Sequence, residues 1–423
     1  MWRGDKPENR RGLGLGSIDM VMAVMLGTTM MIAGCRPGPA PSQAEGRTGD
    51  SPDIPRLELL GKTVAKLRER GWSSPLQLTW SPDGQRLATT HHADKKTSLW
   101  DVSKERLLAS PEGDGRPFQS VAFSPDGSYL ASALYSGGSL GTGKPLVGSS
   151  PPGTSFGLLD GRTGAFLRSI PTPSVGLVPF LPLDAAATDP KGRFVAVRLG
   201  TGPSLPYVVA LYDPKSWEPF RFIETAEPDE LLTAPAERRR LQPFFYHGGM
   251  RISPDGKYLA LMGTTSGGRP RHADIHTFEQ VMVIYDLNSG AAPRTIILAS
   301  IVSGIAVRDF AFSPDGRTLA TGLSDTNSND QIKIWDVATG ALVREYPPVK
   351  GHGISALDWS PRGGIIAVGG FDKRLRLWDA DAPVLLEDIG LSGWPGVVAF
   401  SPDGSRLAYT EDDVIIVRAV NEK

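Results

Sequence analysis

Short apolar runs separated by polar turns fill most of this chain, and the turns share one four-residue phrase. The phrase reads SPDG at Ser81, Ser124, Ser253, Ser313 and Ser401, DPKG at Asp189 and SPRG at Ser360. A short polar residue, then proline, with glycine in fourth place, suits a type I turn, because proline presets φ and the polar side chain caps the backbone. Apolar runs flank each phrase, such as Phe310–Phe312 before and Leu319–Ala320 after. Each phrase therefore predicts a β-hairpin.

A third apolar run in the first six copies ends in a bulky residue followed by aspartate. These pairs are Trp100-Asp101, Leu159-Asp160, Tyr212-Asp213, Tyr285-Asp286, Trp335-Asp336 and Trp378-Asp379. A polar turn and a fourth apolar run follow, for example Ala341–Arg344, whereas the seventh copy keeps only the third run, Val414–Val417. Four strands in each of seven repeats predict an all-β fold, a seven-bladed β-propeller of four-stranded antiparallel blades.

The repeats from Thr63 to Lys423 resemble the WD-repeat family, most closely in the first, fifth and sixth copies, which contain Trp-Asp. In that family a histidine, a Ser/Thr, an aspartate and the tryptophan often form a buried hydrogen-bonded set that pins the blade. The resemblance implies this structural role here for Thr89, Trp100, Trp335, His352, Asp372 and Trp378. Because Val368 stands where the sixth copy should have a hydroxyl, we expect that network to be partial.

Closure of the ring needs a fourth strand for the seventh blade, since a sheet ring is stable only when its last blade is completed. The stretch Thr63–Leu67 alternates as a strand does, so we expect it to supply that strand. With Leu57 and Leu60 the same stretch also fits a short amphipathic helix, and the pattern leaves this alternative open. The predicted propeller domain is residues 56–423.

The N-terminus has a different character. Basic residues Arg3 to Arg11 precede an uncharged stretch, Met20–Gly34, which ends at the one cysteine of the chain, Cys35. The stretch is shorter than the roughly 20 residues that span a bilayer. Residues 1–34, with their Ile-Ala-Gly-Cys ending, resemble a bacterial lipoprotein signal peptide, which implies lipid on Cys35. An ordinary signal sequence or membrane anchor with an incidental cysteine is the alternative.

Residues 35–55 are rich in proline and glycine and poor in apolar side chains, so we interpret them as a tether. We therefore expect a propeller held by its lipid at a membrane of the bacterial cell envelope, outside the cytoplasm. With 45 basic and 46 acidic residues the chain has a formal net charge of -1, so we expect no nucleic-acid partner.

No recurrent nucleophile, base or metal set stands out in the sequence. We therefore expect a monomeric ring that binds a protein partner of unknown identity, and neither an enzyme nor a cofactor protein. Two alternatives remain open: an envelope propeller resembling those of the Tol system, and a propeller enzyme with a site in the central channel.

The connections differ between the two faces of the ring. Strand direction alternates in a blade, so the first-to-second and third-to-fourth turns share one face, which we call the turn face, and the other connections share the loop-rich face. The longest connections are Leu134–Thr154, Gly200–Pro206, Phe222–Gly249 and Gly263–Gln280. All lie on the loop-rich face over blades two to four. Long loops in a compact domain are often functional, so we predict the partner-binding surface there, with neutral insertions as the alternative.

Two clusters occur within these long connections. Arg238, Arg239 and Arg240 precede Phe244 and Tyr246, a mixture of guanidinium groups and aromatic rings that suits a protein interface, although a solvated charge run would look the same. His272, Asp274 and His276 have spacing that could ligate a metal on an extended loop, but chance adjacency is the simpler explanation, so no metal site is predicted.

Overall fold

The computed structural model describes the chain in segments, and these segments contain 32 strands and no helix. The described residues are 59–68, 77–91, 96–111, 118–134, 155–172, 174–175, 178–179, 181–200, 208–224, 241–242, 249–265, 278–301, 306–324, 329–350 and 353–421. Among them, no helix has the length and hydropathy needed to cross a bilayer. The predicted lipid site Cys35 and the segments 1–34 and 35–55 lie outside the described residues.

Most strands form seven antiparallel sheets that follow one another along the chain. Blades one to three are β2 (Gln77–Trp80), β3 (Arg86–His91), β4 (Lys96–Asp101) and β5 (Arg106–Ala109); β6 (Phe118–Phe123), β7 (Tyr129–Leu134), β8 (Ser155–Asp160) and β9 (Phe166–Pro171); and β12 (Leu181–Thr188), β13 (Val195–Gly200), β14 (Val208–Tyr212) and β15 (Pro219–Glu224).

Blades four to seven are β17 (Met250–Ile252), β18 (Tyr258–Thr265), β19 (Phe278–Asp286) and β20 (Arg294–Ile301); β21 (Ala306–Phe312), β22 (Thr318–Ser324), β23 (Asn329–Asp336) and β24 (Leu342–Glu345); β26 (Ile354–Trp359), β27 (Ile365–Gly370), β28 (Arg374–Asp379) and β29 (Leu385–Gly390); and β30 (Val398–Phe400), β31 (Arg406–Glu411), β32 (Val414–Val420) and β1 (Leu60–Leu67). Four short strands lie beside them: β10 (Ser174–Val175), β11 (Val178–Pro179), β16 (Leu241–Gln242) and β25 (Val349–Lys350).

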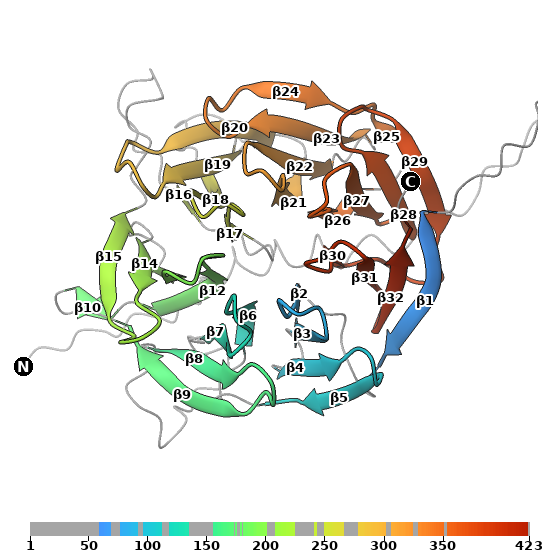
Figure 1. Ribbon diagram of the computed structural model, residues 1–423. Helices are drawn as coiled ribbons and strands as arrows, with labels where there is room; N and C mark the ends of the chain where they lie inside the picture. Colours follow the sequence, from blue (N-terminus) through green and yellow to red (C-terminus); the bar gives the residue numbers. More distant parts are fainter. Residues whose placement is uncertain are drawn as a thin grey trace, which may run out of the picture. The chain divides into compact units, whose positions relative to one another are not determined.

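The blades stand around a central axis with the first strand of each blade innermost (Figure 1). Ring closure follows the prediction. Strand β1 pairs antiparallel with β32, so that Ala65 lies opposite Val417 and Leu67 opposite Ile415. The helical alternative for this stretch is therefore wrong, because Leu60, Ala65 and Leu67 are buried as strand residues of the seventh blade.

The hydrophobic core lies between blades, not in one central mass. Each of the seven clusters of buried apolar side chains draws on two consecutive blades. Leu67 and Trp80 share the cluster that joins blade seven to blade one, which makes the N-terminal strand part of the closing interface. Sheet faces are thereby covered on both sides, which explains the continuous apolar runs in second strands such as β13.

The recurrent four-residue phrase folds as predicted. In the first copy the N–H of Gly84 donates to the carbonyl of Ser81 at 2.8 Å, which closes the turn. Gly84 has φ of 65°, a left-handed conformation that glycine adopts without the steric cost other residues meet. The hydroxyl of Ser81 accepts the N–H of Arg86, and the carboxylate of Asp83 accepts that of Gln85. Turn chemistry therefore accounts for the whole phrase.

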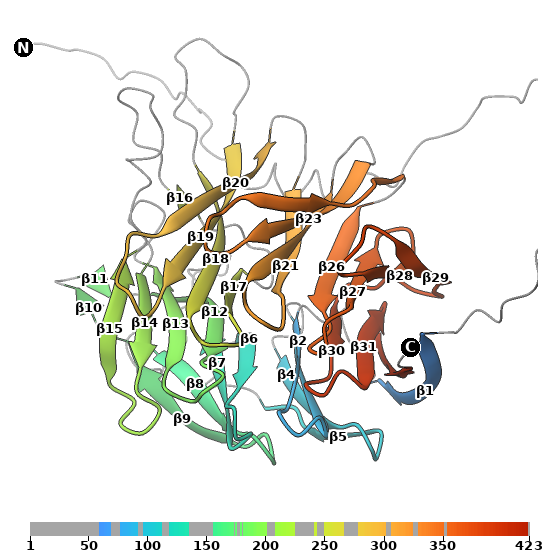
Figure 2. The same cartoon turned by 45° about the horizontal axis from the view of Figure 1, so that its top comes forward.

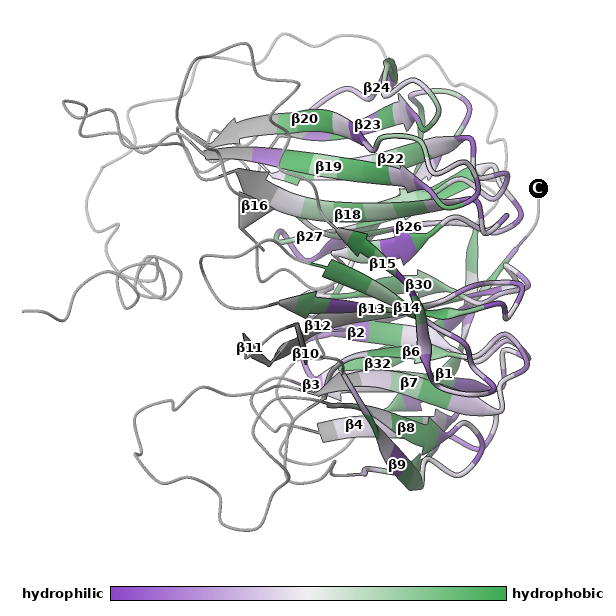
Figure 3. Cartoon of the chain, turned by 90° about the vertical axis from the view of Figure 1, so that its left-hand side faces the viewer, coloured by the Kyte–Doolittle hydropathy of each residue, from purple (hydrophilic) through white to green (hydrophobic). Residues whose placement is uncertain are grey.

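The two faces of the ring differ as the sequence predicts. On the turn face, at the right in Figure 3, the short connections are hydrophilic, while the strands behind them carry the apolar side chains. On the loop-rich face, blade four is the most elaborate described blade, because β18 and β19 pair from Tyr258↔Asp286 to Thr265↔Glu279 and β16 adds two residues to β18. Figure 2 shows these strands rising above the rest of the ring.

Candidate functional site

The innermost strands carry one charged cluster, formed by Arg251 on β17, Asp309 on β21 and Asp358 on β26. The Arg251 guanidinium lies 3.0 Å from Asp309 Oδ1 and 3.6 Å from Asp358 Oδ1. Both carboxylates also accept backbone N–H groups of the next blade. Asp309 accepts that of Leu357 at 3.0 Å, and Asp358 accepts that of Phe400 at 2.7 Å. The cluster thus links blades four to seven near the central axis of the ring.

Burial dominates the electrostatics of this cluster. It raises the pKa of Asp358 from 3.8 to about 6 and also raises the pKa of Asp309, while the attraction of Arg251 acts in the opposite direction on both. A raised carboxyl pKa is a common feature of catalytic acids, so this is the place where the enzyme alternative has to be considered.

The bonding of the cluster favours a structural role. One oxygen of each carboxylate caps the exposed edge of a neighbouring inner strand, which would otherwise leave an N–H group unpaired. Other blades use neutral groups for the same purpose: the amide oxygen of Gln77 accepts the N–H of Val121, and the hydroxyl of Ser120 accepts that of Ala186. Within the described residues, no group of three or more His, Cys, Asp or Glu side chains is arranged to hold a metal ion.

The predicted blade-pinning residues of blades one and five are buried. In blade five the indole N–H of Trp335 donates to the hydroxyl of Thr321 at 2.9 Å, and both are buried. In blade one Thr89 and Trp100 are buried, and the Thr89 hydroxyl lies 3.1 Å from Nε2 of His91. The sequence did not single out Thr321 or His91.

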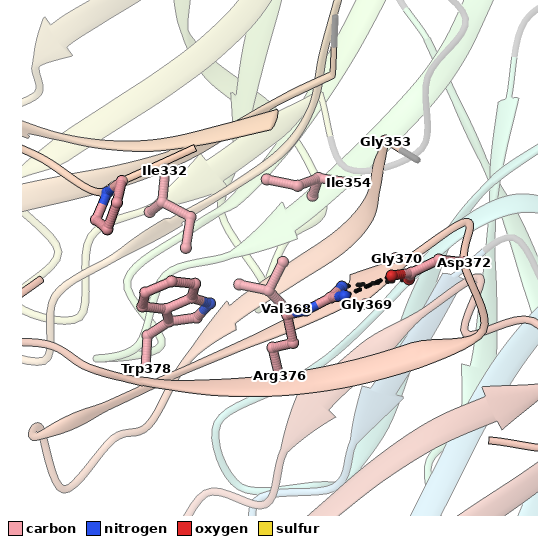
Figure 4. A pocket seen from close by; sticks show the side chains of 10 residues that line it. Ile332, Gly353, Ile354, Val368, Gly369, Gly370, Asp372, Arg376 and Trp378 are labelled. Carbon is pink, nitrogen blue, oxygen red and sulfur yellow. Dashed lines mark hydrogen bonds and ion pairs between the residues drawn. The ribbon is translucent and has the colours of Figure 1, made fainter. Parts of the chain in front are cut away.

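Blade six lacks the equivalent bond. Val368 occupies the position that Thr321 has in blade five, since Val368 lies opposite Arg376 as Thr321 lies opposite Lys333. The buried indole N–H of Trp378 has no hydrogen-bond partner in the described structure, and Figure 4 shows that nitrogen on the side facing Val368, beside a cavity of about 20 Å³.

Asp372 lies at the other end of the same cavity and binds Arg376 instead of the tryptophan. The two side chains form a paired ion contact, one arm of which, Arg376 Nη1 to Asp372 Oδ1, measures 3.2 Å (Figure 4). His352, the remaining predicted member of this set, lies outside the described residues, so the structure places neither its ring nor its partners.

The loop-rich face is described mainly by the strand ends that carry its connections. Residues 135–154, 201–207, 225–240, 243–248 and 266–277 lie outside the described residues. The predicted binding residues Arg238, Arg239, Arg240, Phe244 and Tyr246 belong to this undescribed part, as do His272, Asp274 and His276.

One aromatic cluster of the loop-rich face was missed by sequence reasoning. Phe371 in the turn after β27 lies 5.0 Å from Trp394, which is 40% exposed, and the Arg308 guanidinium lies 5.5 Å from the centre of the Phe371 ring. The three come from blades five and six and from the connection into blade seven. The loop-rich face therefore carries an exposed aromatic ring outside blades two to four as well.

A family model described as "WD domain, G-beta repeat" matches residues 61–101, 106–140, 299–336 and 341–379. Human WD repeat and SOCS box-containing protein 1 is 30% identical over 174 residues, 40% of this chain and 39% of that protein. Protein groucho of Drosophila melanogaster is 30% identical over 171 residues, 40% of this chain and 20% of that protein. The matches span well under half the length of these relatives.

Solved structures share the fold over more of the chain. A chain of "Kuenenia stuttgartiensis Hydrazine Synthase" aligns with a TM-score of 0.59 and 17% identity, covering 84% of this chain and 98% of that one. A chain of "Crystal Structure of Mitotic Checkpoint Complex" aligns with a TM-score of 0.57 and 18% identity, covering 92% and 100%. At these identities the likeness concerns the fold alone, and a fold shared by such different assemblies names no activity.

Proposed function

Because the chain carries WD40 repeats in a seven-bladed β-propeller, we propose that it is a protein-binding scaffold held at a membrane through lipid on Cys35. Its partner docks on the loop-rich face over blades two to four. The observation that carries the proposal is the asymmetry of the ring: turn-face connections are short and closed by their own hydrogen bonds, whereas the long connections gather on the opposite face.

A scaffold reading also fits the polar groups of the described core. The carboxylates of Asp309 and Asp358 and the hydroxyl of Thr321 all serve to join strands or blades. A catalytic group must be within hydrogen-bond reach of a substrate, and these side chains are committed to partners inside the protein. The relatives whose names mention WD repeats support the same class of function.

The experiment is pull-down from native membranes after chemical crosslinking, with loop-trimmed protein as the comparison. Replacing residues 135–154, 200–207 and 266–278 by two-residue Asn-Gly turns preserves the pairing of the flanking strands, because such turns join antiparallel neighbours directly. We expect one or more partners to be lost on trimming. The matched control shortens residues 325–328 of blade five, which connect the same pair of strands outside the proposed surface.

Partners recovered equally by the trimmed protein and by the blade-five control would refute the proposed surface. Thermal unfolding of both proteins separates this result from misfolding, since trimming surface connections leaves the interblade core intact.

The anchor has its own test. We expect a fatty-acid probe to label the full chain and to be lost in Cys35→Ser, with the propeller then released from the membrane fraction. A Cys35→Ser protein that retains lipid would refute the anchor without touching the proposal about the loop-rich face.

A further inference from the structure

A groove lies on the turn face, between blades two and three, away from the loop-rich surface. It has a volume of about 580 Å³, within the range of ligand-binding pockets. Its walls come from the two first-to-second turns, from the start of β9 and from the turn that joins β14 to β15. The residues that matter here are Tyr129, Leu167, Arg168, Lys191, Lys215 and Trp217.

Trp217 occupies a backbone position at which three other blades have glycine and blade one has Glu105, with φ of 48°. The φ of Trp217 is 61°, and the equivalent turn position is Gly164, Gly290 and Gly340 in blades two, four and five, with φ of 73°, 63° and 74°. A bulky residue in this left-handed region is a genuine outlier and carries a cost on the order of 1–3 kcal/mol. Local turn stability alone would favour glycine here.

Packing holds the Trp217 side chain in the groove wall. Its ring lies 5.1 Å from Tyr129 in an edge-on arrangement and 6.0 Å from Phe156. Burial and the nearby Asp126 carboxylate raise the pKa of Tyr129 to about 12, so its hydroxyl stays protonated. The result is a rigid aromatic wall that crosses from blade two to blade three, the kind of anchor on which binding hot spots are built.

The rim of the groove is cationic. Arg168 on β9, Lys191 in the blade-three turn and Lys215 beside Trp217 are exposed, and none of them makes an ion pair within the described residues. The one acidic lining residue, Asp126, is bonded to Ser128 at 2.7 Å, and its pKa is lowered by hydrogen bonds from Ser124 and Ser128. Three cations against one carboxylate contrast with the formal net charge of -1 of the whole chain.

A free strand edge borders the groove. Strand β9 pairs with β8 on one side and with no other strand of the described segments on the other. Leu167 on β9 is 54% exposed at the groove wall. An extended peptide can pair its backbone with such an edge while placing side chains in the adjacent groove. A sugar has the hydroxyls for hydrogen bonds but no backbone for this pairing.

We propose that the groove between blades two and three is a second binding site, and that its occupant is an extended acidic peptide segment with an aromatic or aliphatic side chain. That side chain rests against Trp217 and Tyr129, and the flanking carboxylates face Arg168, Lys191 and Lys215. The site is independent of the loop-rich surface, because it opens on the opposite face.

The test uses a library of random heptapeptides displayed on phage, depleted on Trp217→Gly protein and then selected on the wild-type propeller. Trp217→Gly removes the wall while giving the turn the residue that three other blades have, so the fold is expected to persist. We expect enriched peptides with net negative charge and an aromatic or leucine residue. Depletion on a second variant, Arg168→Ser/Lys191→Ser/Lys215→Ser, covers the case in which Trp217→Gly destabilises the ring.

Binding constants of the enriched peptides are then measured by fluorescence polarisation. Loss of three exposed ion pairs, each contributing about 0.2–1 kcal/mol, weakens binding between about 3- and 150-fold. Arg317→Ser, which removes an 85% exposed turn-face arginine of blade five, leaves binding unchanged. Loop-trimmed protein also binds these peptides as tightly as the wild type, which separates this site from the proposed function.

The proposal is overturned if no peptide survives depletion, if the survivors are neutral or basic, or if the triple variant binds them as well as the wild type. Binding of a polygalacturonate oligomer that Trp217→Gly abolishes, with no surviving peptide, would assign the groove to an acidic sugar instead and would also overturn it.

Discussion

Exchanging one side chain between blades five and six tests whether the hydrogen bond from the buried tryptophan N–H to a threonine hydroxyl stabilises the blade. Thr321→Val removes the acceptor of the Trp335 indole N–H, whose 2.9 Å bond is buried. A buried donor left without a partner costs about 1–3 kcal/mol. Val368→Thr is the reverse exchange, since it offers a hydroxyl to the Trp378 N–H that has no partner in the described structure.

We expect Thr321→Val to lower the melting temperature and Val368→Thr to leave it unchanged or raise it. Unfolding entropy of about 2.1 cal/mol/K per residue over the Leu57–Lys423 unit converts 1–3 kcal/mol into about 1–4 °C. Differential scanning calorimetry resolves such a shift, and the two substitutions change the same atoms in opposite directions. A loss in Val368→Thr as large as that in Thr321→Val would refute the reasoning, because the added hydroxyl would then lack a partner too.

The other predictions concern the charged cluster of Arg251, Asp309 and Asp358, the turn carboxylate Asp403, and the closing strand β1. Because burial raises the pKa of Asp358 to about 6 from 3.8, the folded state binds its proton more tightly than the unfolded state, so stability rises as pH falls from about 6 to about 4. Unfolding free energies from denaturant titrations at pH 4.5 and 7 should therefore differ by about 2 kcal/mol more in the wild type than in Asp358→Asn, and equal differences in the two proteins would contradict this. Below pH 4 the sign reverses. Although burial opposes it, hydrogen bonds from Ser401 and Ser405 lower the pKa of Asp403 to about 2, so stability is lost as this carboxylate is protonated. In the closing strand, Leu67→Ala should cost about 2–5 kcal/mol because Leu67 is fully buried, whereas its 43% exposed neighbour Val64 tolerates alanine within about 0.5 kcal/mol; deletion of residues 63–68 should abolish cooperative unfolding, and a full-stability truncate would refute closure by β1.

The fold could be predicted because its signals are local and repeated. Proline, glycine and a short polar residue specify each turn on their own, as the bonds of Ser81 and Gly84 show. Seven copies of a weak signal make a strong one. Closure was also predictable, although Ala65 and Val417 pair across the two ends of the ring. The seventh repeat lacked a fourth strand, and the stretch before the first repeat had the alternation of a strand.

The groove could not be predicted, since its parts are far apart in sequence and individually unremarkable. Tyr129 is one aromatic residue after a turn, and Trp217 differs from Gly164 only in standing at a position whose left-handed φ the sequence does not display. Their contact at 5.1 Å arises from the packing of blade two on blade three. The charged cluster of the inner strands could not be predicted for the same reason, because Arg251, Asp309 and Asp358 belong to three different repeats.

Comparison of equivalent positions shows where this ring departs from its own repeat. At the position of the turn glycine, Gly340 fulfils the backbone requirement with no side chain, while Trp217 meets the same requirement at a steric cost and packs its ring against Tyr129 and the buried Phe156. Capping an inner strand likewise needs only a neutral acceptor, as Gln77 and Ser120 provide, yet Asp309 and Asp358 use a charge and then require Arg251 to balance it. Both departures make contacts between blades: Trp217 packs against Tyr129 of blade two, and Arg251 joins the carboxylates of blades five and six.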